Sequence, residues 1–123
     1  MLCSKLLPLV FFLGVYYNMI NSGNTSPEVL RDYAAIESQI AGVDTQKVLY
    51  TIEKESQFNH KAENKNDMAM GCDSIGLVQI RDCNHPEVSY TQATNPIFAV
   101  NFLIENIDKC NTWWKNTCGK YRP

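Results

Sequence analysis

The sequence predicts a small, mainly α-helical domain that two disulfides hold together. Its 123 residues suit a single domain, and a content of 45% hydrophobic and 20% charged residues is ordinary for a globular protein. Apolar residues recur at helical spacing along much of the chain, and few segments favour strands. Four cysteines follow an apolar leader, and an even count in a small exported chain indicates a disulfide framework.

The charge balance argues against a nucleic-acid partner. Lysine and arginine number 11 against 13 acidic residues, which gives a formal net charge of −2. Proteins that bind DNA or RNA usually carry a basic patch, because phosphate contacts supply much of their affinity. The sequence has no basic run longer than a pair, so no nucleic acid is expected as a partner.

Residues 1–23 are predicted to form a signal peptide. Lys5 precedes an apolar run at 6–15, which has the length of a signal-peptide core and is shorter than the roughly 20 residues that span a bilayer. Cleavage is expected in the polar stretch 21–24, which lacks the usual small-residue pattern. An uncleaved anchor, which would add a membrane contact, and a helix of the fold itself remain alternatives. The mature domain is expected over 24–123, secreted, periplasmic or associated with the cell wall.

The four remaining cysteines are expected to pair. Three pairings are possible, and we favour the one in which each bond closes a short loop. Zinc is not favoured, because the sequence has no Cys-x-x-Cys pair, and His60 and His85 are not spaced to complete a ligand set. No cofactor is expected. The favoured pairs are Cys72 with Cys83 and Cys110 with Cys118.

Capping signals predict three clear helices. Each begins after a Ser, Asp or Asn side chain that can accept hydrogen bonds from the first turn, and two have proline at the first helical position. The third is apolar nearly all round and is therefore expected in the core. The expected ranges are about 27–41 after Ser26, a helix after Asp44 that runs to about Phe58, and a helix from Pro96 after Asn95.

The segments between these helices are expected to be less regular. The polar stretch 59–67 predicts an exposed loop that borders the binding site. The apolar segment 75–80 is too short to decide between a strand and a buried helical turn. The tail 110–123 carries aromatic residues beside a predicted disulfide, and we expect it to fold back as a lid. His60 and His85 are expected in loops rather than in catalysis.

Glu55 has an unusual place on the second predicted helix. A helical wheel puts it inside the apolar stripe formed by Val48, Ile52 and Phe58. Glu53 falls on the opposite face, where a glutamate is ordinary. Burial of a carboxyl group disfavours its charged form and raises its pKa, which suits a general acid at neutral pH. A glutamate satisfied by a core hydrogen bond, or one that reaches water at the edge of the stripe, is the structural alternative.

Two short motifs stand at a characteristic spacing around this glutamate. Glu-Ser-x-Phe occupies 55–58, Ser-Ile-Gly-Leu-Val-Gln-Ile occupies 74–80, and an Asn-Pro helix start follows at 95–96. Together they resemble the catalytic domain of soluble lytic transglycosylases, within the goose-type lysozyme-like superfamily. The resemblance covers about residues 44–121 and implies a lysozyme-like helical fold.

The resemblance also implies a reaction and its residues. The reaction is cleavage of the β-1,4 bond between N-acetylmuramic acid and N-acetylglucosamine in peptidoglycan, so the glycan strand is the expected partner. Glu55 matches the catalytic acid of the family, and Gln79 matches the glutamine that lines its sugar cleft. Ser56 and Ser74 match serines that support the site.

The chain departs from the family pattern at one tyrosine. Many members have an Ala-Tyr-Asn-Ala-Gly segment whose tyrosine lies near the glutamate, and nothing in this sequence matches it. Tyr90 and Tyr121 are the candidate substitutes, and Tyr121 belongs to a closing pattern with Trp114 that short members share. Trp113 and Trp114 fit sugar stacking, although tryptophan beside a disulfide is more often part of a core or lid.

A single carboxylate is enough for a lytic transglycosylase. Ordinary glycosidases need two. Here Glu55 would protonate the leaving oxygen and then accept the proton of the muramic acid 6-hydroxyl, which attacks the anomeric carbon and forms a 1,6-anhydro sugar. Because the nucleophile belongs to the substrate, the attack gains effective molarity. A lysozyme-type hydrolase would instead use Asp67, Asp73 or Asp82 as its second carboxylate.

Other functions stay open. In a catalytically silent glycan-binding module, Glu55 and Gln79 would be dispensable, and in a structural protein unrelated to glycan the motif match would be accidental. If the protein is an enzyme, it could serve wall remodelling, passage of a secretion or conjugation apparatus, or attack on other cells. Small size favours local wall opening, by analogy at the level of the fold.

Overall fold

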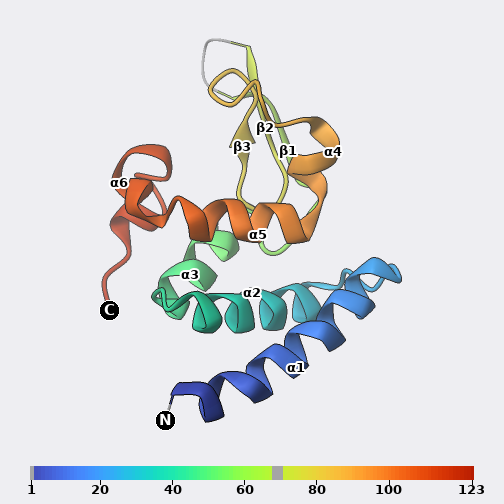
Figure 1. Ribbon diagram of the computed structural model, residues 1–123. Helices are drawn as coiled ribbons and strands as arrows, with labels where there is room; N and C mark the ends of the chain where they lie inside the picture. The colour runs from blue at the N-terminus through green and yellow to red at the C-terminus, as the bar shows by residue number, and fades with distance from the viewer. Residues whose placement is uncertain (1, 68–70) are drawn as a thin grey trace.

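The chain is mainly helical with a small antiparallel sheet, as the sequence predicts (Figure 1). The computed structural model describes the backbone of residues 2–67 and 71–123 and the side chains of 6–65 and 71–123. Two short 3₁₀ turns, at Ile107–Lys109 and Cys118–Lys120, flank the last helix. The helices and strands are α1 (Leu2–Asn21), α2 (Pro27–Ala41), α3 (Thr45–Ser56), β1 (Glu63–Asp67), β2 (Cys72–Ile75), β3 (Ile80–Arg81), α4 (Tyr90–Thr94), α5 (Pro96–Glu105) and α6 (Cys110–Trp113).

The helix starts predicted from capping residues are confirmed. The side chain of Ser26 accepts a hydrogen bond from the first turn of α2, Asp44 does the same for α3, and Asn95 for α5. Gly42 ends α2 in the left-handed conformation, with φ +74°. α3 ends at Ser56, two residues before the predicted end, because residues 57 and 58 both have positive φ and turn the chain away.

The core lies where α2, α3 and α5 meet the turn between β2 and β3. α5 crosses between α2 and the sheet (Figure 1), and its nearly all-apolar surface is buried on several sides, as predicted. The buried apolar residues at the centre come from all four segments. They include Leu30, Tyr33 and Ala34 of α2, Val48 and Ile52 of α3, Leu77 and Val78 of the turn, and Ala99, Val100 and Leu103 of α5.

The three strands form an antiparallel sheet in the order β1-β2-β3. Glu63 faces Ile75 across β1 and β2, and Ile75 faces Ile80 across β2 and β3. The predicted loop at 59–67 is therefore wrong over 63–67, where a fully polar segment pairs through its backbone. The segment 75–80 is neither a single strand nor a buried helical turn, the two forms that the sequence leaves open. It contains the end of β2, a buried turn and the start of β3.

Both predicted disulfides are confirmed. Cys72 in β2 bonds to Cys83 just after β3, with Cα atoms 5.5 Å apart, and Cys110 in α6 bonds to Cys118, with Cα atoms 5.4 Å apart. Each bond closes a short loop. The first fastens the end of the sheet, and the second fastens the C-terminal tail.

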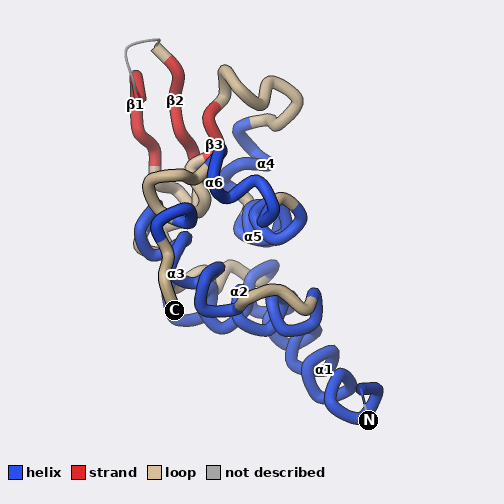
Figure 2. The backbone as a smooth tube through the Cα atoms, turned by 90° about the vertical axis from the view of Figure 1, so that its left-hand side faces the viewer, coloured by secondary structure: helices blue, strands red, loops and turns tan. Residues whose placement is uncertain are grey.

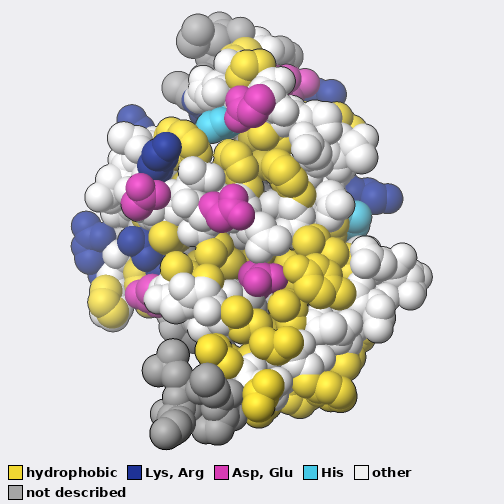
Figure 3. Space-filling view, viewed as in Figure 1, with side chains coloured by type: hydrophobic (Ala, Val, Ile, Leu, Met, Phe, Trp, Pro, Cys, Tyr) yellow, Lys and Arg dark blue, Asp and Glu magenta, His cyan; other side chains and the backbone are white. Residues whose placement is uncertain are grey.

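Residues 2–21 form the helix α1, which packs against α2. Ile20 is buried, and the Tyr16 hydroxyl donates a hydrogen bond of 2.8 Å to Asp32 of α2. The N-terminal half extends beyond the rest of the molecule (Figure 2), and apolar side chains gather over α1 on the face shown in Figure 3. No helix among the described residues is both long and apolar enough to cross a bilayer. The signal peptide over 1–23 stays a prediction. The exposed apolar side chains of α1 include Leu7, Val10, Phe11, Phe12 and Val15.

Gly76 begins the buried turn and cannot carry a side chain. Its φ is +84°, and a Cβ atom built there would lie 1.9 Å from the carbonyl oxygen of Ala93. Its own N–H donates to the carbonyl of Ala62 at 2.8 Å. The turn can therefore approach both the segment before β1 and α4 only because residue 76 is glycine.

Substitution of Gly76 tests this close approach. Gly76→Ala should lower the free energy of unfolding by about 3 kcal/mol, because left-handed strain adds to overpacking against a backbone atom. Gly42→Ala is the matched control, since Gly42 also has positive φ but has no atom within 4 Å of a Cβ. It should cost about 1 kcal/mol. Equal losses in thermal unfolding would contradict the predicted clash.

Candidate active site

A cleft of about 470 Å³ lies between the sheet and the C-terminal tail. One wall comes from α3, the strands and the buried turn. The other wall is the loop that the Cys110–Cys118 disulfide closes, and this loop supplies more than half of the lining residues. The lining residues are Glu55, Asn64, Ser74, Gln79 and Arg81 on the first wall, and Thr112, Trp113, Trp114, Lys115, Asn116 and Thr117 on the second.

Glu55 reaches the cleft from the last turn of α3. It is partly buried, and Val48 and Ile52 on the same face are fully buried. Glu53 lies on the surface, where its carboxylate pairs with Arg31 at 3.2 Å. The two glutamates therefore lie on opposite faces of α3, as the helical wheel predicts.

Thr117 from the opposite wall contacts Glu55 directly. Its hydroxyl donates a hydrogen bond of 2.6 Å to Oε2 of Glu55. The same hydroxyl lies 3.4 Å from the carbonyl oxygen of Trp114, a much longer approach. This contact joins residues 62 positions apart in the sequence across the cleft.

Side chains from two distant segments hold the buried turn. The Ser56 hydroxyl donates to the carbonyl of Leu77 at 2.7 Å, and Nε1 of Trp114 donates to the carbonyl of Val78 at 2.8 Å. Buried carbonyls without a donor cost about 1–3 kcal/mol each. These two hydrogen bonds therefore join α3 and the C-terminal loop to the turn that carries Gln79.

Gln79 closes the turn upon itself. Its φ is +54°, and its Nε2 donates to the carbonyl of Gly76 at 3.0 Å and to that of Ala62 at 3.2 Å. Both partners are carbonyl oxygens, so Nε2 is the donor atom and Oε1 is the acceptor atom of the amide group.

The structure brings three of the predicted site residues together and places three elsewhere. Glu55, Ser74 and Gln79 line the cleft. The remaining three are not among its described lining residues: the Ser56 hydroxyl donates to the turn, the Tyr90 hydroxyl donates to Glu63, and the Tyr121 ring packs 5.4 Å from that of Tyr50.

Tyr90 belongs to an exposed polar group on the sheet edge. The hydrogen bond from Tyr90 lowers the pKa of Glu63, and Lys65 at 3.1 Å lowers it further. The same hydrogen bond raises the pKa of Tyr90 above its ordinary value. The hydroxyl of Tyr90 therefore pairs with Glu63 on the sheet edge.

The two tryptophans have different surroundings. Trp114 is 5% exposed and belongs to the core, one of the two places expected for a tryptophan beside a disulfide. Trp113 is 41% exposed, and its ring lies 5.9 Å from that of Phe102 at an interplanar angle of 15°. Trp113 is therefore the indole accessible from the cleft.

The sequence does not predict two residues of the first wall or most residues of the second. Asn64 and Arg81, on the first wall, lie on strands, and the motif pattern gives no sign of either. The residues of the second wall that the sequence does not predict all fall within the predicted Cys110–Cys118 loop: Thr112, Lys115, Asn116 and Thr117. The predicted disulfide is therefore the sequence feature that could have indicated this wall. The sequence does not show that the loop faces Glu55.

The aspartates considered as second carboxylates have other partners or are not described. Asp73 pairs with Lys65 at 3.5 Å, and Asp82 accepts a hydrogen bond of 3.1 Å from the backbone N–H of Asp73. The side chain of Asp67 lies outside the described residues. Among the described residues that line the cleft, Glu55 is the one carboxylate.

A metal site is not formed by the described residues. The one group of suitable side chains close enough to hold an ion is Cys72, Cys83 and Asp82, and both sulfur atoms belong to the disulfide. The histidines have other contacts: His60 lies 3.0 Å from the carbonyl of Thr94, and the His85 ring packs 4.5 Å from Trp113.

No family model, curated protein or solved structure matches this chain. The resemblance to soluble lytic transglycosylases therefore remains a prediction that depends on the motif residues. In the structure, those residues lie around one cleft and one buried turn.

Substitution of Trp114 tests the link between the two walls. Trp114→Phe keeps an aromatic ring but removes the N–H that bonds to Val78, so the free energy of unfolding should fall by about 1–3 kcal/mol for the unpaired carbonyl. Trp113→Phe removes the same atoms at an exposed site and should change the melting temperature little. Similar losses for both variants would contradict the proposed link.

Proposed function

We propose that this protein is a peptidoglycan lytic transglycosylase that uses Glu55 as its one acid–base group. The proposal depends on a single observation: Glu55 stands on an apolar helix face and is the one carboxylate among the described residues of a polar cleft. The motif resemblance supplies the substrate, which is the β-1,4 bond between N-acetylmuramic acid and N-acetylglucosamine.

The polar lining of the cleft suits a sugar. Asn64, Gln79 and Asn116 carry amide groups, which can bond to sugar hydroxyl and acetamido groups. Trp113 lines the same cleft, and its ring is packed against Phe102 and His85 and lies 4.6 Å from the ammonium group of Lys109. Lys115 and Arg81 add positive charge, which is compatible with the carboxylates that peptidoglycan carries.

Glu55 would act twice in one reaction. In its acid form it protonates the glycosidic oxygen as the bond to the anomeric carbon of muramic acid breaks. The resulting carboxylate then takes the proton of the 6-hydroxyl while that oxygen bonds to the same anomeric carbon. The product ends in a 1,6-anhydro ring, and Glu55 returns to its acid form without consuming water.

The alternative of hydrolysis has less support. A hydrolase needs a second carboxylate as nucleophile or as base for water. Asp73 and Asp82 have partners on the sheet, and neither is among the described residues that line the cleft. An intramolecular attack needs no such group, because the substrate supplies its own nucleophile.

The two disulfides are consistent with an exported protein. A secreted, periplasmic or wall-associated location would bring the cleft to peptidoglycan strands.

Replacement of Glu55 tests the proposal. Glu55→Gln keeps the side-chain volume and removes the titratable proton, so release of soluble fragments from purified peptidoglycan should fall by at least ~100-fold. Glu53→Gln is the matched control, because it makes the same change two residues away on the opposite, exposed face. It should release fragments at the wild-type rate.

The outcomes separate an enzyme that uses Glu55 from a glycan-binding module. Retained cleavage by Glu55→Gln would exclude Glu55 as the acid. A wild-type protein that sediments with peptidoglycan but releases nothing would indicate a glycan-binding module. Equal melting temperatures of the two variants would show that any loss is chemical.

A further inference from the structure

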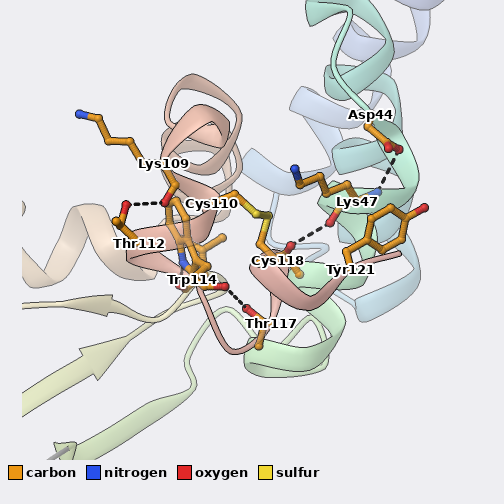
Figure 4. The surroundings of a disulfide bond; sticks show 12 residues. Asp44, Lys47, Lys109, Cys110, Thr112, Trp114, Thr117, Cys118 and Tyr121 are labelled. Carbon is orange, nitrogen blue, oxygen red and sulfur yellow. Dashed lines mark hydrogen bonds between the residues drawn. A yellow bond between two sulfur atoms is a disulfide. The ribbon is translucent and has the colours of Figure 1, made fainter. Parts of the chain in front are cut away.

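The wall opposite Glu55 is held in place from both ends. The Cys110–Cys118 disulfide closes the loop (Figure 4). The backbone N–H groups of Thr117 and Gly119 both donate to the carbonyl of Trp114, at 3.1 and 2.9 Å. The Trp114 ring is buried and bonded to Val78. Thr117 therefore stands in a short, closed and anchored segment that gives its hydroxyl little freedom.

The two distances at the Thr117 hydroxyl show which acceptor takes its hydrogen. A hydroxyl group has one hydrogen to donate, and strong O–H···O bonds are about 2.7 Å long. Oε2 of Glu55 lies at 2.6 Å, whereas the carbonyl of Trp114 lies at 3.4 Å. The hydrogen therefore points at Glu55.

We propose that Thr117 is a positioning residue that holds the Glu55 carboxyl group in one orientation across the cleft. This inference rests on the proposed function, since it assigns a partner to the same acid.

The same hydrogen bond serves both states of the reaction. A charged carboxylate accepts hydrogen bonds through both oxygens, and a protonated carboxyl group still accepts through its carbonyl oxygen, so Glu55 can accept the Thr117 hydrogen in either state. Glu55 alternates between these states as it gives up a proton and takes one back. A donor that stays in place keeps the carboxyl group from rotating between the two steps, which preserves its alignment with the reacting oxygens.

Two substitutions separate positioning from packing. Thr117→Val keeps the shape of threonine and removes the hydroxyl, whereas Thr117→Ser keeps the hydroxyl and removes the methyl group. With full-length protein and purified peptidoglycan, Thr117→Val should lower kcat by about 10- to 100-fold with little change in KM. Thr117→Ser should retain kcat within about 3-fold, which is less than the loss of one hydrogen bond.

A purely structural role predicts the reverse order, with valine tolerated and serine impaired. That order, or a wild-type kcat for Thr117→Val, would overturn the inference while leaving the proposed function intact. A wild-type protein that releases no fragments would overturn both. Thermal unfolding of each variant accompanies the kinetics, and Thr117→Ala replaces the valine variant if that protein does not fold.

Discussion

The hydrogen bond from Nε1 of Trp114 to the carbonyl of Val78 is the interaction on which the rest of the site depends. It lies in the interior and joins the disulfide loop to the turn between β2 and β3. Without it, the turn would keep a buried acceptor unpaired, and the loop would lose its attachment to the core. The position of Thr117 opposite Glu55 follows from this bond, because the Thr117 backbone is itself bonded to Trp114.

The motif residues divide into two kinds when they are placed in the fold. Gly76 and Ser56 build the turn: the glycine allows the close approach to Ala93, and the serine hydroxyl pairs with Leu77. Glu55 and Gln79 face the cleft. A glutamate next to a serine on α3 thus places one side chain for chemistry and the other for architecture, since successive residues on a helix point in different directions.

Local signals predicted the parts of the fold that local interactions determine. The helix starts follow from Ser26, Asp44 and Asn95, which bond to their own first turns, and both disulfides follow from short loops. The strand β1 was missed because its side chains are polar and its pairing is made by backbone atoms. Thr117 was missed because its partner is 62 residues away, and no periodic pattern connects the two.

The central claim is that one carboxylate and the substrate's own hydroxyl perform the cleavage. The most direct test measures the mass of the soluble products that the protein releases from purified peptidoglycan. The account predicts products that end in 1,6-anhydro-N-acetylmuramic acid and are lighter by one water than hydrolysis products. Products with ordinary reducing ends would contradict it, because water would then be the nucleophile and a second group would have to activate it.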